Sequence, residues 1–102
     1  MTDAHVIREE AGTISVGPAV LAHVVRASAE AVDGARVRRP RRGLDVAVDG
    51  DRARVSVELA VRYGAVLPDV AEEVQRRVAD ALRSICGLEA DAVDVAVEEL
   101  DG

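Results

Sequence analysis

The chain has 102 residues, of which 49% are hydrophobic and 31% charged, and its formal net charge is −6. This length fits one domain with one core, and the composition argues against bulk disorder. Tyr63 is the only aromatic residue, so the sequence lacks the base-stacking platforms of single-stranded nucleic-acid binders, and its acidic balance repels nucleic acid and anionic lipid.

The cysteine content and the hydropathy of the chain indicate in which cellular compartment the protein is expected. Cys86 is the single cysteine, so the chain can form neither an intramolecular disulfide nor a thiolate cluster for a metal. Residues 1–12 are polar, which does not fit a signal peptide, and no segment approaches the roughly 18–20 apolar residues of a membrane span. We therefore expect a cytoplasmic protein without direct membrane insertion, peripheral to a membrane only through a partner. Residues 1–11 are expected to be a flexible polar tail, and residues 12–102 a single domain.

The first part of that domain predicts a short strand and a helix. Thr13–Val16 has strand character, and Gly17-Pro18 ends it with a proline suited to the first turn of a helix. Apolar residues recur at helical spacing over residues 18–32, so this helix buries one face, and Asp33-Gly34 is a stop signal. The arginine-rich stretch 36–42 is interrupted by proline and predicts a loop.

The second part predicts a hairpin, a helix and a final strand. Residues 44–49 and 53–62 alternate between apolar and polar, so each strand buries one face, and Asp49-Gly50 between them favours a tight hairpin. A second amphipathic helix is predicted over residues 68–86. The last strand is predicted over residues 92–100, where valine alternates with acidic residues or alanine.

The order of the elements is therefore β-α-β-β-α-β. Because each helix is apolar on one side only, we expect an α+β two-layer sandwich with both helices on one face of an antiparallel or mixed sheet. A ferredoxin-like fold is the first candidate. The short first strand leaves a related α+β arrangement open.

Several segments in this order carry a family resemblance. They are Gly12–Ser15, Val55–Gly64, Leu67–Val78, Gly87-Leu88 and Val93–Val95. Over residues 12–100 the chain resembles the bacterial alkaline-shock, or envelope-stress, protein family. The resemblance implies a non-enzymatic protein of the cell-envelope response, which self-associates and is held near the membrane by an integral membrane partner.

The sequence predicts no catalytic, metal or cofactor site. Neither His5, in the tail, nor His23, on the polar side of the first helix, has the positioned partner that a general base needs. Cys86 lies at the C-terminal end of a helix, where the helix dipole disfavours a thiolate, so it is expected to be a structural thiol. We expect no enzyme, no small-molecule substrate and no cofactor.

Two surfaces are candidates for binding. The first is the arginine loop, whose guanidinium groups could hold phosphate, carboxylate or an acidic protein surface, or could simply be solvated. Its members are Arg36, Arg38, Arg39, Arg41 and Arg42. The second is the polar face of the sheet, which suits a protein–protein contact or only water. Its members are Arg54, Ser56, Glu58, Arg62, Asp94 and Glu98.

Two functional hypotheses follow. The first is a scaffold or adaptor that forms homo-oligomers and binds a membrane-anchored protein at the cytoplasmic side of the envelope. The alternative is a small RNA- or ribosome-associated module that binds through Arg36–Arg42. The acidic net charge and the near absence of aromatic residues disfavour the alternative, so a nucleic-acid partner is not expected.

Overall fold

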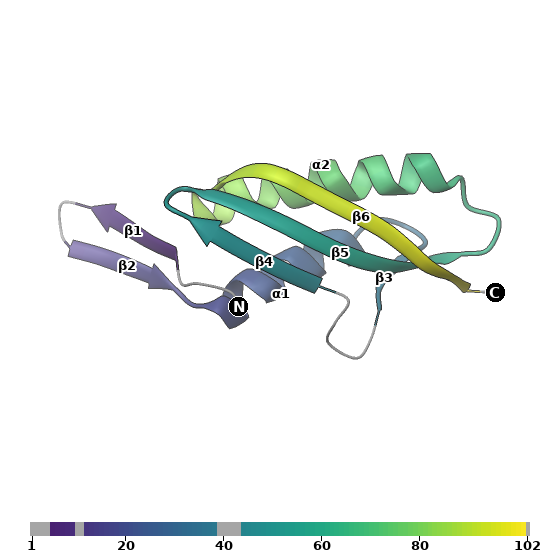
Figure 1. The fold of residues 1–102 in the computed structure, drawn as a ribbon, viewed down its shortest axis with the longest axis horizontal. Helices are drawn as coiled ribbons and strands as arrows, with labels where there is room; N and C mark the ends of the chain where they lie inside the picture. The colour runs from purple at the N-terminus through teal and green to yellow at the C-terminus, as the bar shows by residue number, and fades with distance from the viewer. Residues whose placement is uncertain (1–4, 10–11, 39–43, 102) are drawn as a thin grey trace.

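A computed structural model of the chain describes residues 5–9, 12–38 and 44–101, with side chains described over residues 16–38 and 44–100. Figure 1 shows the elements in chain order. They are β1 (His5–Glu9), β2 (Gly12–Val16), α1 (Pro18–Glu30), β3 (Ala35–Val37), β4 (Leu44–Asp49), β5 (Arg52–Arg62), α2 (Leu67–Cys86) and β6 (Glu89–Asp101).

The first two strands form a hairpin-like pair outside the main sheet. They are antiparallel, with His5 opposite Val16 and Glu9 opposite Gly12, and Figure 1 shows them extending past the end of the sheet. The strand predicted at Thr13–Val16 is therefore present but does not join the main sheet. His5–Glu9, which we expected in a flexible tail, form a strand, because pairing with β2 supplies backbone hydrogen bonds that apolar periodicity does not reveal.

The main sheet is mixed and is organised around β5. Strand β6 pairs with β5 in parallel along its whole length, whereas β3 and β4 pair with it antiparallel. Since a strand has only two edges, β3 and β4 share the second edge of β5: β4 lies beside residues 52–57 and β3 beside residues 59–61. The parallel pairing follows from α2, which carries the chain back between β5 and β6.

Strand β3 corrects part of the predicted arginine loop. Arg36 lies within this strand, between Ala35, which pairs with Val61, and Val37, which pairs with Leu59. Val37 is 1% exposed, and its backbone N–H donates to the Glu30 carboxylate of α1 over 2.9 Å. The burial of Val37 and the hydrogen bonds on both sides of its backbone stabilise β3 as a strand. The arginines around this valine leave no apolar alternation from which the strand could be predicted.

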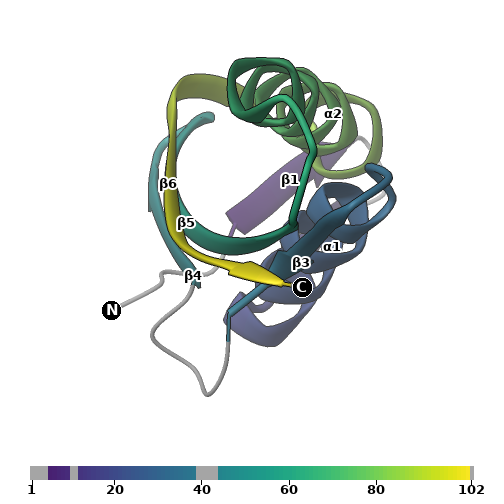
Figure 2. The ribbon, with the colours of Figure 1, turned by 90° about the vertical axis from the view of Figure 1, so that its right-hand side faces the viewer.

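Both helices cover the same face of the sheet, and no described helix or strand covers the other face (Figure 2). The core lies between the two layers and is built almost entirely from valine and leucine. Its fully buried large side chains come from both helices, from β3, β4 and β5, and from the link between α2 and β6: Leu21, Val25, Val37, Val46, Val55, Val57, Leu59, Val61, Val74, Val78, Leu82 and Leu88.

The ends of the helices follow the predicted signals. Proline occupies the first turn of both helices, where its missing N–H is not needed. Gly87 ends α2 with a left-handed φ of 70°, and its N–H donates to the carbonyl of Arg83, as in a common helix C-cap. Cys86, the last residue of α2, is 1% exposed, which agrees with its prediction as a structural thiol.

Strand β6 contains two bulges that keep its apolar side chains in phase with the core. The register with β5 shifts after Ala90 and after Val97, so Asp91 and Glu98 have no partner residue on β5. Without these extra residues Ala90, on one side of the bulges, and Leu100, which pairs with Val61, could not share the inner side of β6 with Val93, Val95 and Val97, because side chains alternate strictly along a strand.

The structure confirms the predicted fold class: an α+β two-layer sandwich with a mixed sheet and both helices on one face. The order α1, two strand segments, β5, α2 and β6 matches a ferredoxin-like arrangement in which the first strand, here β2, lies outside the sheet.

Candidate interaction surface

The uncovered face of the sheet, which we call the outer face, is organised in rows of paired residues. Residues that pair directly across neighbouring strands point to the same face. Ser56 of β5 pairs with Asp45 of β4 and with Asp94 of β6, so these three side chains form one row across the sheet. Arg54 lies one row away, between the small side chains of Ala47 and Ala92, which also pair with it directly.

Most of the predicted sheet-face residues share this face. Arg54, Glu58 and Arg62 occupy alternate outward positions of β5, and Asp94 lies beside them on β6. Glu98 lies at the second bulge of β6, outside the regular alternation. Asp45 on β4 belongs to the same surface but was not predicted, since sequence alternation alone does not show which β4 residue lies opposite Ser56.

One ion pair joins the two predicted binding surfaces. The backbone N–H of Arg38 donates to the Glu58 carbonyl over 2.9 Å, which extends the β3 pairing by one residue. The Arg38 side chain reaches across β5 to β6, where Nη1 lies 3.4 Å from Oε1 of Glu98. The described part of the arginine cluster is thus continuous with the sheet face.

A groove lies at this end of the outer face. It has a volume of about 450 Å³ and is lined by Arg36, Val37, Arg38, Ala60 and Glu99. Ala60, which lines it, is only 2% exposed although its position on β5 faces outward. The remaining predicted members, Arg39, Arg41 and Arg42, lie outside the described residues. Of the described arginines, Arg38 is paired with a carboxylate of the sheet.

Two further arginines of β5 are held by carboxylates. Arg62 Nη2 lies 2.8 Å from Oδ2 of Asp33, and Arg52 forms an ion pair with Asp91 at the first bulge of β6. In each case the hydrogen bond to the aspartate raises the pKa of the arginine above its ordinary value. Arg54 is therefore the one arginine of β5 without an ion pair to another described residue.

Carboxylates that have no cationic partner among the described residues gather beside Arg54. Within the described part of the chain, the side chains of Asp45, Glu58 and Asp94 form no hydrogen bond or ion pair. They line a hollow of about 160 Å³ together with Ser56, Val57, Val95 and Ala96. The outer face thus places Arg54, which has no ion pair to another described residue, one row from an acidic hollow.

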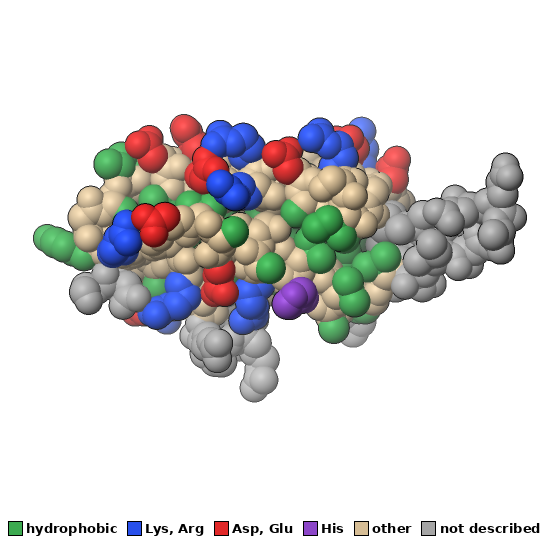
Figure 3. Space-filling view, turned by 180° about the vertical axis from the view of Figure 1, so that it is seen from behind, with side chains coloured by type: hydrophobic (Ala, Val, Ile, Leu, Met, Phe, Trp, Pro, Cys, Tyr) green, Lys and Arg blue, Asp and Glu red, His purple; other side chains and the backbone are tan. Residues whose placement is uncertain are grey.

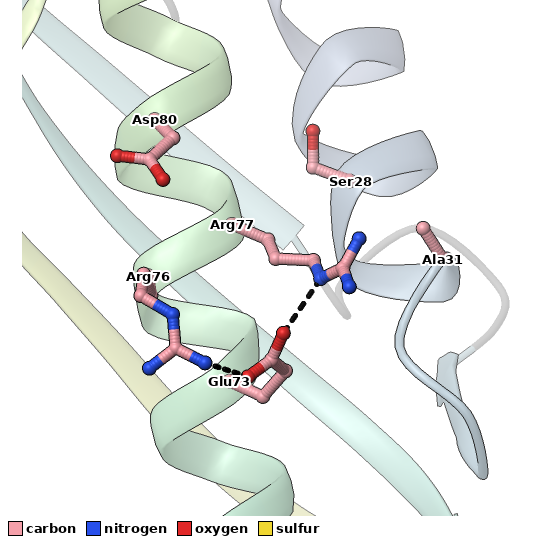
Figure 4. A pocket seen from close by; sticks show the side chains of 6 residues that line it. All are labelled: Ser28, Ala31, Glu73, Arg76, Arg77 and Asp80. Atoms are coloured by element: carbon pink, nitrogen blue, oxygen red, sulfur yellow. Dashed lines mark hydrogen bonds and ion pairs between the residues drawn. The ribbon is translucent and has the colours of Figure 1, made fainter.

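The helix layer, seen in Figure 3, carries a different surface. Charged side chains follow α2, and apolar side chains gather on another part of this layer. His23 is exposed on α1, as predicted. A groove of about 470 Å³ between the helices is lined by Ser28 and Ala31 of α1 and by residues of α2. Figure 4 shows Glu73 bound by both Arg76 and Arg77, with a distance of 2.8 Å to Arg77 Nε, so the charges of this groove are largely satisfied internally.

The described residues carry no sign of metal or nucleophilic chemistry. They contain no group of three or more histidine, cysteine, aspartate or glutamate side chains that could hold a metal ion. Desolvation raises the pKa of the buried Cys86 thiol, so this group is not an activated nucleophile. In the described part of the chain, no helix is both long and apolar enough to cross a membrane.

The fold and this surface together define a small two-layer α+β domain with an open, charged sheet face. A family model described as the alkaline-shock protein 23 family, with a cell envelope-related function, matches residues 35–101. The chain belongs to this alkaline-shock family, as its sequence segments predict.

Beyond the family, the comparison with known proteins supports only the fold of the chain. No curated protein matches the chain. Among solved structures it is similar to the CTD of an Asp-to-Asn variant of MamM in its zinc form, with a TM-score of 0.56 and 18% sequence identity. That match covers 82% of this chain and 87% of the MamM chain.

Proposed function

We propose that the chain is a non-enzymatic scaffold of the cell envelope, which self-associates and binds a membrane-anchored protein at the cytoplasmic side. Membership of a family with an envelope-related function supports the envelope role. The outer face carries the scaffold role, because it combines Arg54 with three carboxylates that have no ion-pair partner within the described residues.

Such a face is suited to a specific, reversible contact. Exposed charges are well solvated in the free protein. A complementary charged surface adds favourable electrostatic interactions and fixes the orientation of the two partners. A self-associating scaffold also presents several copies of its partner site, so its affinity for a protein held in a membrane rises through avidity. Self-association and membrane recruitment are therefore linked in this proposal.

Affinity purification from solubilised membranes tests the proposal. The tagged chain should recover an integral membrane protein, and neutralising the outer face by Asp45→Asn, Glu58→Gln and Asp94→Asn should lower that recovery about tenfold through lost avidity. The matched control neutralises three carboxylates on the helix layer, by Asp69→Asn, Glu72→Gln and Asp80→Asn, and should keep the recovery. A strictly monomeric chain that recovers no envelope protein would contradict the proposal.

A further inference from the structure

We infer that the outer face docks on the outer face of a second copy of this chain, with Arg54 of each copy inserted into the acidic hollow of the other. This inference rests on the self-association in the proposed function and assigns it to one surface.

The row geometry of the sheet makes the outer face complementary to itself. Arg54 projects from between two alanines, Ala47 and Ala92, so no tall side chain stands beside it in its row. In the next row Ser56 is short and is flanked by Asp45 and Asp94. The two rows are two residues apart along the strands, or about 6.8 Å at a rise of about 3.4 Å per residue. A projecting cation and an acidic hollow are thus immediate neighbours.

One two-fold axis satisfies both contacts at once. If the axis lies between the two faces, runs across the strands and passes between the rows, it exchanges the rows of the two copies. Arg54 of each copy then lies over Ser56 of the other, between Asp45 and Asp94. The interface is isologous and closed, which is the commonest symmetry of soluble homo-oligomers.

The chemistry of the hollow fits a guanidinium group. Its volume of about 160 Å³ is bounded by the carboxylates of Asp45, Glu58 and Asp94 and by the methyl group of Ala96. Guanidinium presents five N–H donors in a planar fork that matches carboxylates. Arg52 and Arg62 are engaged with Asp91 and Asp33, which leaves Arg54 as the arginine of β5 available for this contact.

The small residues of the face allow the two sheets to approach. Ala47, Ala92 and Ser56 leave room for packing at the usual distance of about 10 Å between sheets. The contact spans only three strands, so we expect a reversible dimer that depends on protein concentration and not a permanent one. Because its ion pairs lie near solvent, added salt should weaken it.

Sedimentation velocity on charge-reversed chains tests this docking. Arg54→Glu alone should be monomeric, because the introduced carboxylate meets an acidic hollow. The double variant Asp45→Arg with Asp94→Arg should also be monomeric, because Arg54 then meets a basic hollow. An equimolar mixture of the two should dimerise again, since both contacts of the mixed dimer join opposite charges. Circular dichroism should show native folding for both, as all three residues are exposed.

Matched reversals on the helix layer provide the control. Arg26→Glu on α1 and Glu72→Arg on α2 lie on the layer opposite the outer face and should sediment as the wild type does. If Arg54→Glu dimerises like the wild type, or if the mixture stays monomeric, the docking is wrong while self-association stands. If the wild type is monomeric at every concentration, both the docking and the self-association are wrong. This holds even if the monomer binds a membrane protein through the outer face.

Discussion

Cys86 shows how burial sets the chemistry of a single side chain. The thiol is 1% exposed at the end of α2, whereas its neighbour Ile85 is 64% exposed, so a step of one residue separates core from solvent. Burial disfavours the charged thiolate and raises the pKa of this thiol. The sequence predicts a structural thiol from the place of Cys86 at the C-terminal end of a helix, and the burial agrees with that prediction.

We predict that Cys86 is protected from thiol reagents in the folded protein. At pH 8 a chromogenic disulfide should react slowly with the native chain and rapidly after unfolding in guanidinium chloride. The matched control is Ser84→Cys in a Cys86→Ala background, which places a thiol on an exposed position of the same helix and should react at once. Equal rates for the two thiols would contradict the burial.

The same burial predicts a pH dependence of stability. The unfolded chain loses the thiol proton at a lower pH than the folded chain, because the pKa is raised only in the folded state. The free energy of unfolding therefore falls as pH rises above the ordinary thiol pKa. This alkaline loss should be smaller in Cys86→Ala.

At the scale of elements, β6 shows how bulges decide which side chains face the core. Deleting Glu98 should be tolerated, because it removes a bulge and one exposed ion pair worth up to about 1 kcal/mol while Leu100 stays on the core face. Deleting Ala96 should lower the free energy of unfolding by more than about 3 kcal/mol, because Val97 would turn outward and a carboxylate would face Leu59. Urea unfolding compares the two deletions, and equal losses would contradict the assigned register.

Most elements could be predicted from periodicity, and those that could not have an identifiable physical reason. Both helices, the β4–β5 hairpin and β6 carry clear apolar alternation or helical spacing. Strand β3 has a single buried valine among arginines, and β1 depends on backbone pairing with β2, so neither leaves a pattern in the sequence. The parallel pairing of β6 depends on the path of α2, which alternation within a strand does not encode.

At the scale of the whole molecule, most residues of the candidate site could be predicted from the sequence, but not which of them lie next to one another. Outward positions of β5 and β6 follow from alternation, which found Arg54, Glu58, Arg62 and Asp94. The ion pair between Arg38 and Glu98 joins residues sixty positions apart, and its existence depends on β3 pairing beside β5. The place of Asp45 on the outer face likewise depends on strand pairing, because the register of β4 with β5 puts it opposite Ser56.

The central claim is that the outer face assembles an envelope scaffold, and localisation in the cell of origin tests it most directly. A fluorescent protein fused before residue 1 should mark the cell periphery in the wild type. Arg54→Glu should spread the signal through the cytoplasm, whereas Arg26→Glu should leave it at the periphery. A wild-type signal spread evenly through the cytoplasm, or a peripheral signal unchanged by Arg54→Glu, would contradict the account.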